Sequence, residues 1–414
     1  MVTNSPFFDD LETRPAEQRE AALMAALRRQ LAHAKAHAPA YARLLADVDP
    51  AEIVDRRTLA LLPVTRKGEL IERQRAAPPF GGFAAAAPGA LARIFSSPGP
   101  LYDPEGKGRD YWRLARALHA AGFRAGDVVH NCFSYHLTPA GAMLESGAQA
   151  IGCAVIPGGT GQSEQQARTI ADVRPSGYVG TPSFLAIILD KAGELGIDLS
   201  CLGKALVSGE AFPAALRTRF AKSGIAALQC YATADLGLIA YESAAREGLI
   251  LDEGVIVEIV RPGTGDPVGP DEVGEVVVTT LTPEYPLIRF GTGDLSAFLS
   301  GTSPCGRTNH RIKGWMGRAD QAAKVKGMFV QPAQIDELVK RHHEIIRARL
   351  VVDRDTAGGD VMTLMIEMGE PAEKLARIAE TLQALTKLRG AVTRVAPGGL
   401  PNDGKVIDDI RKPG

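Results

Sequence analysis

The chain of 414 residues lacks a cysteine framework. It has five cysteines, which are widely spaced and never form a CxxC pair. A disulfide scaffold needs an even set of cysteines, and a four-cysteine zinc site needs closely spaced pairs of ligands. The sequence therefore argues against a disulfide-rich protein and against a four-cysteine zinc site.

Long apolar runs and an excess of one charge are also missing. No stretch approaches the ~20 apolar residues of a membrane-spanning helix, and residues 1–13 have no basic start before an apolar core, unlike a secretory signal. The 47 Lys and Arg residues balance 48 Asp and Glu residues. This balance argues against a protein that coats nucleic acid or an anionic membrane. We expect a soluble cytoplasmic protein without nucleic-acid or membrane partners.

The composition that remains is that of a globular protein. Hydrophobic residues make up 45% of the chain and charged residues 23%, which excludes wholesale disorder. Aromatic residues are only 6%, so Ala, Leu, Val and Ile must supply most of the packing. The length predicts two or three domains at roughly 150 residues each.

Helical and strand-like segments alternate through the middle of the chain. Residues 15–46 are rich in helix formers, whereas seven prolines between residues 63 and 104 favour loops and short elements over 60–105. The alternation that follows predicts an α/β domain with a largely parallel sheet. Its expected helices are 111–121, 138–147, 162–173, 184–195 and 214–223, and its expected strands are 127–133, 150–156, 177–180 and 204–208.

From about residue 249 the pattern changes to β-rich runs. Strands at 255–260 and 274–280 flank a Gly/Pro turn region, as in a hairpin or meander. A smaller unit with the order βαββαβ follows. Its expected strands are 324–329, 347–352, 361–367 and 392–395, and its expected helices are 332–342 and 372–388. The sequence therefore predicts domains at 1–316 and 317–414.

Short polar motifs occur in a definite order after these elements. Each could be an ordinary turn by itself. The motifs are Ser208–Glu210, Cys230–Asp235, Arg289–Leu295, Gly317–Asp320 and the loop Gly399–Lys405.

Together, these motifs resemble the acyl-adenylate-forming superfamily, and within it the phenylacetate–CoA ligase family. Leu62–Lys67 is similar to that family's Leu-Pro-Phe-Thr-Thr-Lys, and the likeness extends over nearly the whole chain. Further matching segments are 121–129, 154–157, 286–289 and 305–308. The resemblance implies an α/β fold with a large multi-sheet N-terminal domain and a small, mobile α+β C-terminal domain.

The resemblance also implies an activity. Such enzymes join a carboxylate to the α-phosphate of ATP and release pyrophosphate, after which a thiol, usually coenzyme A, displaces AMP. The first step brings two anions together, so it needs cations and a metal ion. The implied cofactors are ATP, Mg²⁺ and coenzyme A, and the implied substrate is a small aryl or arylacetic acid. A homodimer is a family-level expectation.

Particular residues acquire nucleotide-binding roles by this resemblance. Asp294 would hold the ribose hydroxyls, Arg318 would contact ribose or phosphate, and Tyr231 would stack on the adenine. The other implied nucleotide-binding positions are Ser208, Gly209, Glu210, Ala232, Ser96 and Ser97.

The implied catalytic group includes Thr233 at the α-phosphate and Asp235, which would orient Mg²⁺. Lys405 would neutralise charge during adenylation, and Asp320 would lie at the hinge of the small domain. Candidates for the acyl pocket are Lys67, Tyr135, His136, Gly158 and Gly159. For each of these five a core or loop role is an equal alternative.

The sequence departs from the family at the phosphate loop. Ser-Ser-Gly-Thr-Thr-Gly-Lys-Pro is replaced by Ser96–Leu101, which lacks both threonines and the lysine. Pro98 and Pro100 also remove amide donors that could face phosphate oxygens. The expected grip on the β- and γ-phosphates is therefore weaker, and Lys107 and Arg109 are candidate substitutes.

Two further departures concern metals. Asp235 stands where the family has Glu, so its carboxylate is retracted by about 1.5 Å. Of the Cys/His positions that look like a zinc site in relatives, only Cys305 remains here. We therefore expect no structural zinc.

Three functions stay open on the sequence. The first is an ATP-dependent acid–CoA ligase, and the second is an adenylating ligase with an amine or carrier-protein acceptor. The third is a non-catalytic protein that binds a nucleotide or acyl-CoA. The altered phosphate loop favours the third function, and Lys405 favours the first two.

Overall fold

The computed structural model describes most of the chain as two compact units. The described residues are 5–97, 101–319, 323–326, 328–355, 359–368, 375–401 and 406–411. One unit contains residues 1–292 and 297–314, and the other contains 293–296 and 315–414. The predicted domain boundary at 316/317 stays a prediction. Residues 293–296 and 315–316, which precede it, belong to the smaller unit.

A nine-stranded sheet forms the centre of the larger unit. Its order is β14-β15-β10-β9-β8-β7-β6-β4-β5, and the five strands from β8 to β5 are parallel. The parallel strands are β4 (Val128–Asn131), β5 (Ala154–Pro157), β6 (Gly177–Gly180), β7 (Lys204–Val207) and β8 (Ala226–Thr233). The antiparallel extension consists of β9 (Gly237–Glu242), β10 (Leu249–Leu251), β15 (Arg311–Ile312) and β14 (Phe298–Leu299). The predicted α/β architecture is confirmed.

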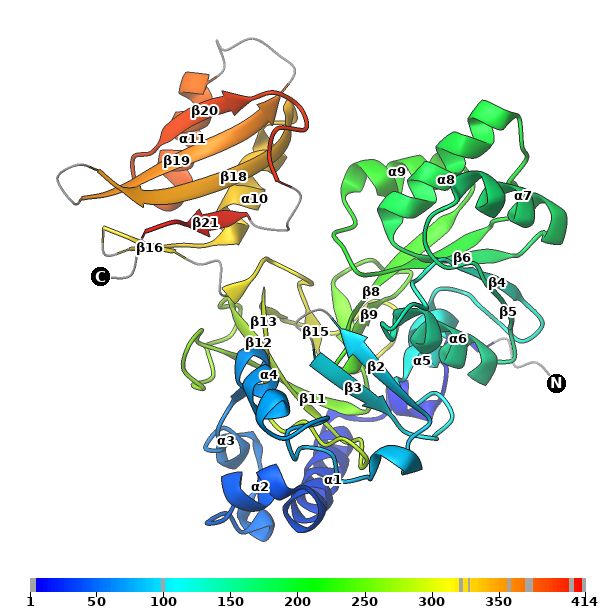
Figure 1. The fold of residues 1–414 in the computed structure, drawn as a ribbon, viewed down its shortest axis with the longest axis vertical. Helices are drawn as coiled ribbons and strands as arrows, with labels where there is room; N and C mark the ends of the chain where they lie inside the picture. Colours follow the sequence, from blue (N-terminus) through cyan, green and yellow to red (C-terminus); the bar gives the residue numbers. More distant parts are fainter. Residues whose placement is uncertain are drawn as a thin grey trace. The chain divides into compact units, whose positions relative to one another are not determined.

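Helices cover both faces of the parallel strands (Figure 1). Val179 and Leu206 pack with α5 and α6, whereas their neighbours Tyr178 and Ala205 pack with α7, α8 and α9. Successive residues of a strand point to opposite faces, so strands covered on both sides are mostly apolar. The helices are α5 (Leu114–Ala120), α6 (Ala140–Ala150), α7 (Ser163–Val173), α8 (Pro182–Leu195) and α9 (Ala214–Lys222).

A second sheet has the order β1-β13-β12-β11. Its strands are β1 (Thr65–Arg66), β11 (Val255–Val260), β12 (Gly274–Thr280) and β13 (Phe290–Ser296). The predicted pairing of 255–260 with 274–280 is confirmed as an antiparallel hairpin. Leu27 and Leu31 of α1 pack on Ile256 and Val276 of this sheet.

The N-terminal third contains more regular structure than its prolines suggest. Helices α1 (Ala16–His37) and α2 (Pro39–Leu44) are separate because Pro39 begins the second. Within 60–105, where we expected loops and short elements, the structure has the ten-residue helix α4 (Lys67–Ala76). Its sequence contains no proline. The remaining elements are η1 (Asp10–Thr13), η2 (Pro50–Glu52), α3 (Arg56–Leu59), η3 (Pro88–Ala90) and the hairpin of β2 (Arg93–Ser97) and β3 (Leu101–Glu105).

The smaller unit is an α+β module, as predicted. Its sheet has the order β20-β19-β18-β21. The elements are β18 (Ile345–Arg354), β19 (Asp360–Met368), β20 (Ala391–Val395), β21 (Ile407–Asp409), α10 (Pro332–Arg341) and α11 (Leu375–Thr386). The single strand predicted at 324–329 is wrong. That segment is a hairpin of β16 (Ala323–Val325) and β17 (Met328–Val330), with Lys326 in the left-handed conformation at its turn.

Among the residues that the structure describes, none of the helices combines the length and apolarity that a membrane span requires.

Candidate functional site

Four of the sequence-predicted site segments lie at the carboxyl edge of the parallel strands. Ser208 follows β7, Thr233 ends β8, Gly158 follows β5, and Tyr135 lies in the loop after β4. Parallel strands end at one edge of a sheet, and this edge is where open α/β sheets bind ligands. The structure therefore brings together candidates from four separate segments.

The turn after β7 is held by its own polar side chains. The Ser208 hydroxyl donates to the Cys230 carbonyl oxygen at 2.8 Å, and a Glu210 carboxylate oxygen accepts from the Ser183 amide at 2.6 Å. Ser183 lies in the first turn of α8, where a negative charge is favoured by the helix dipole. Gly209 between them has a φ of +84°. These contacts fix the turn, and its place at the adenine stays a prediction.

A tight turn between β8 and β9 positions Asp235. The Thr233 hydroxyl accepts from the Leu236 amide at 3.2 Å. Gly237 has a φ of +72°, and a Cβ there would lie 2.7 Å from the Trp112 carbonyl oxygen. Only glycine fits both the conformation and the contact. Tyr231 and Ala232, on β8, precede this turn, and their nucleotide-binding roles stay predictions.

Lys67 reaches this turn from the start of α4. Its ammonium nitrogen lies 3.2 Å from Oδ2 of Asp235, whose side chain is 3% exposed. Sequence reasoning assigned Lys67 to the acyl pocket and Asp235 to Mg²⁺. The structure places the two side chains together, so Lys67 stands beside the proposed metal ligand.

Asp103 is a site residue that the sequence analysis missed. It lies on β3 and has no exposed surface. Its carboxyl group lies beside the carboxyl group of Asp235 and the hydroxyl of Ser97. Burial and the Asp235 charge raise the pKa of Asp103 well above its ordinary value. No described residue makes a hydrogen bond of good geometry with either oxygen of Asp103 or with Oδ1 of Asp235. The sequence feature that could have indicated Asp103 is its position two residues after the altered phosphate loop.

Ser96 and Ser97 end β2, and three residues, 98–100, separate them from β3. The Ser96 amide donates to the Leu137 carbonyl oxygen at 2.8 Å, and Ser97 is buried. Residues 98–100 lie outside the described residues. In sequence, the segment Ser96–Leu101 has six residues where the family loop has eight.

The acyl-pocket candidates have structural contacts of their own. The Tyr135 hydroxyl accepts from the Asn131 side-chain amide at 2.8 Å, and the exposed His136 donates its backbone amide to Ser134. Gly158 leaves room for Gln166, which donates to its carbonyl oxygen at 2.8 Å. Gly159 has a φ of +66°. Their contacts to a substrate stay predictions.

His130 and Gln166 are further residues that sequence reasoning missed. His130 is fully buried on β4, and its Nε2 lies 2.7 Å from Oε1 of Gln166. Burial lowers the His130 pKa, so the ring is neutral near pH 7. His130 thereby contacts Gln166, whose side-chain amide donates to the Gly158 carbonyl oxygen and so holds the turn.

Asp294 and Arg318 meet within the smaller unit. Their backbones form an isolated bridge, and Nη1 of Arg318 lies 3.4 Å from Oδ1 of Asp294. The Trp315 indole donates to the same oxygen at 3.1 Å. The two residues predicted to contact ribose are therefore adjacent. Lys405 and Asp320, predicted to act in catalysis and as the hinge, lie outside the described residues.

Cys305 has hydroxyl and guanidinium neighbours. Its sulfur lies 3.1 Å from the Ser303 hydroxyl and 3.7 Å from Nη1 of Arg307. Burial raises its pKa, but hydrogen bonds involving Ser243 and Ser303 outweigh that effect and lower the pKa overall. The part of the chain that the structure describes holds no group of three or more His, Cys, Asp or Glu side chains placed for a metal ion. The expected lack of zinc stays a prediction.

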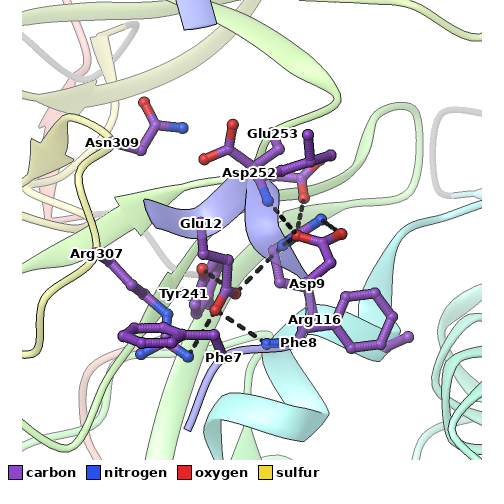
Figure 2. Close-up of polar contacts among 12 residues, drawn as sticks. Phe7, Phe8, Asp9, Glu12, Arg116, Tyr241, Asp252, Glu253, Arg307 and Asn309 are labelled. Carbon is purple, nitrogen blue, oxygen red and sulfur yellow. Dashed lines mark hydrogen bonds and ion pairs between the residues drawn. The ribbon is translucent and has the colours of Figure 1, made fainter. Parts of the chain in front are cut away.

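A buried charge network around Glu12 ties the N-terminal segment to the sheet (Figure 2). Glu12 is 1% exposed and accepts from the Tyr241 hydroxyl at 2.7 Å. It also lies 3.0 Å from Arg307 and 3.3 Å from Arg116. The network joins the N-terminal segment to β9 and to the loop that carries Arg307.

Comparisons with solved structures show which known fold this is. A 2-hydroxyisobutyryl-CoA ligase in an open conformation with 2-HIB-AMP and CoA superposes with a TM-score of 0.81 at 22% identity, covering 98% of this chain and 95% of that one. The same ligase in its postadenylation state gives 0.82 at 24% identity, covering 99% and 93%. These likenesses establish the fold.

Sequence comparisons identify the family. A search against protein-family models gave no match. Phenylacetate-coenzyme A ligase of Thermus thermophilus is 32% identical over 380 residues, or 87% of this chain and 84% of the relative. The enzyme of that name from Escherichia coli is 32% identical over 392 residues (89% and 87%), and that from Aromatoleum evansii is 30% identical over 397 residues (92% and 88%). The chain therefore belongs to the phenylacetate-coenzyme A ligase family.

Proposed function

We propose that this protein is an AMP-forming acid–CoA ligase that activates an aryl or arylacetic acid. The observation that supports this most is the 30–32% identity to phenylacetate-coenzyme A ligases over about nine-tenths of the chain. In the first half-reaction a carboxylate oxygen attacks the α-phosphorus of ATP, and the bond to pyrophosphate breaks. In the second, the CoA thiolate attacks the acyl carbon, and AMP leaves.

The strand ends supply groups suited to the nucleotide. We place the adenine at Ser208–Glu210 and Tyr231, the α-phosphate at Thr233, and the ribose at Asp294 and Arg318. A ribose diol donates to a carboxylate, and an aromatic ring stacks on a base. Lys405 would hold positive charge where the substrate carboxylate meets the α-phosphate.

Mg²⁺ belongs to the proposal as a cofactor of ATP. The residues present fit this ion, because Oδ1 of Asp235 is a buried carboxylate oxygen without a donor among the described residues. Such an oxygen is the ligand type that Mg²⁺ prefers. When bound, Mg²⁺ would neutralise phosphate charge. Lys67 holds the second oxygen of Asp235, which fixes the direction of the first.

A second candidate is a protein that binds nucleotide or CoA without turnover. The three-residue connection between β2 and β3 favours it, because that connection lacks the lysine and threonines of the family loop. An adenylating ligase with an amine or carrier-protein acceptor differs only in the second half-reaction. The homodimer that the family resemblance implies remains part of the proposal.

The decisive experiment follows pyrophosphate release with Mg-ATP across aryl and arylacetic acids, with and without CoA. Lys405→Ala tests the proposed catalytic lysine, and Lys340→Ala is the matched control on α10. We expect acid-dependent release that is lost in Lys405→Ala and retained in Lys340→Ala, with thioester formed only when CoA is present. Binding of AMP or CoA without release from any acid would favour the second candidate. Acyl transfer to an added amine, but not to CoA, would favour the other acceptor.

A further inference from the structure

Two carboxyl groups are buried together beside the altered phosphate loop. Asp103 comes from β3 and has no exposed surface, and Asp235 comes from the β8–β9 turn and is 5% exposed. The two carboxyls are electrostatic neighbours, with the Ser97 hydroxyl beside Asp103. They lie 132 residues apart in sequence, so the fold alone brings them together.

Two ionised carboxyls at this place would leave a negative charge that is not offset. A buried carboxylate without hydrogen-bond donors is costly, and a second carboxylate beside it raises the cost. Among the described residues, the cation that the structure places against the pair is Lys67, which contacts Oδ2 of Asp235. One ammonium can offset one carboxylate. Three oxygens, both of Asp103 and Oδ1 of Asp235, make no hydrogen bond of good geometry with a donor in the described part of the chain.

These oxygens have the chemistry of a divalent-cation site. Carboxylates are hard ligands, and Mg²⁺ in nucleotide enzymes is usually bound by one or two carboxylates together with substrate phosphates. Asp103 follows the end of the altered loop, Leu101, by two residues, so it lies next to the segment expected at the phosphates.

We infer that Asp103 is a second carboxylate ligand which, together with Asp235, holds the divalent cation that accompanies the phosphates of ATP. This inference rests on the proposed function, because it takes ATP as the source of the phosphates. The pair would place a divalent charge near the phosphates, where the sequence lacks the loop lysine. Asp103 thereby offers a physical reason why the altered loop need not abolish nucleotide binding.

The test measures metal binding instead of turnover. Mn²⁺ is titrated into the whole protein, and free Mn²⁺ is followed by its EPR signal, with and without a non-hydrolysable ATP analogue. Asp103→Asn removes one charged ligand at constant size. Glu105→Gln is the matched control, because Glu105 is a buried carboxylate on the same strand that pairs with Arg93.

We expect Asp103→Asn to weaken Mn²⁺ binding in the presence of the analogue by at least about tenfold. Binding of the analogue without metal, and Mn²⁺ binding by Glu105→Gln, should stay at the wild-type level. A crystal of the wild-type protein with Mn²⁺ and the analogue needs no variant. It should show an anomalous peak within about 2.5 Å of oxygens from both Asp103 and Asp235.

Several results would overturn the inference. These are wild-type Mn²⁺ affinity in Asp103→Asn, a peak that contacts Asp235 alone, or a wild-type protein that binds no Mn²⁺ with the analogue. Asp103 would then be a protonated neighbour of Asp235. Failure of the proposed function is a separate result, since absence of pyrophosphate release with every acid leaves the Mn²⁺ comparison intact.

Discussion

The Lys67 ammonium lies 3.2 Å from the Asp235 carboxylate, although 168 residues separate them in the chain. Lys67 begins α4, and Asp235 lies in the turn between β8 and β9. Each was expected to have a different partner, an acyl group for Lys67 and a metal ion for Asp235. Their pairing links the N-terminal region to the proposed nucleotide site.

Replacing Lys67 should therefore impair the use of ATP more than the use of the acid. Lys67→Met removes the cation that offsets Asp235, and we expect kcat/KM for ATP to fall by about 10²–10³-fold. Lys67→Arg should retain part of the activity because it keeps the charge. Pyrophosphate release at varied ATP and varied acid separates the two effects. A change confined to KM for the acid would instead support the acyl-pocket role.

Gly237→Ala should disturb the turn that carries Asp235. The added Cβ would meet the Trp112 carbonyl oxygen at 2.7 Å, and the positive φ disfavours alanine. We expect a loss of about 1–3 kcal/mol in the free energy of unfolding, together with reduced adenylation. Gly193→Ala, in α8 with nothing near its Cβ position, is the control and should be neutral or slightly stabilising. Urea unfolding of both variants measures the difference, and equal stability would contradict this view of the turn.

Glu12→Gln should destabilise the larger unit. Glu12 is the buried carboxylate against Arg307, so its neutralisation leaves that buried guanidinium without the carboxylate that offsets it. Arg116, which Glu12 also contacts, keeps its ion pairs with Asp9 and Asp252. Breaking such a pair costs about 3–5 kcal/mol. Glu164→Gln, in an exposed pair with Arg168, should cost less than about 1 kcal/mol. Thermal unfolding of the two variants provides the comparison, and similar melting temperatures would show that the network contributes little.

Asp110 should make stability depend on pH. Burial raises its pKa to about 7, with the Asp252 charge adding to the effect and the Ala115 amide opposing it. The native protein then holds a proton that the unfolded chain, with a pKa near 3.8, has already lost. The protonated Asp110 contributes its full share to the free energy of unfolding below about pH 4. That share falls as the pH rises to about 7, by at most about 1.4 kcal/mol per pH unit.

The amide side chain of the Asp110→Asn variant cannot lose a proton, so the free energy of unfolding of this variant should not depend on pH through residue 110. We expect the urea midpoint of wild type to drop relative to that of Asp110→Asn between pH 5 and pH 8. Parallel midpoints across this range would show that Asp110 titrates near its ordinary pKa.

Local sequence patterns predicted much of the fold. The ranges 177–180, 255–260 and 274–280 coincide with β6, β11 and β12, because strands buried on a sheet are short apolar runs with clear turn signals at their ends. The hairpin at 323–330 was mistaken for one strand, since a turn around Lys326 interrupts a segment of strand-forming residues. β21 was missed because three residues give too short a pattern.

The candidate site was predictable only in part. Ser208–Glu210 and Thr233–Asp235 follow strands, so their meeting at one edge follows from the order of elements. Asp103 and the Lys67–Asp235 pair could not be predicted in this way. Their contacts join segments far apart in sequence, and no local pattern states which side chains a fold will bring together.

One measurement tests the central claim most directly. The protein is mixed with Mg-ATP and phenylacetic acid or a related aryl acid, without CoA, in a single turnover, and the quenched products are separated by mass. We expect an acyl-adenylate that accumulates and is converted to acyl-CoA and AMP when CoA is added. If ATP stays intact with every acid while the protein still binds AMP, the account of this chain as an AMP-forming ligase is contradicted.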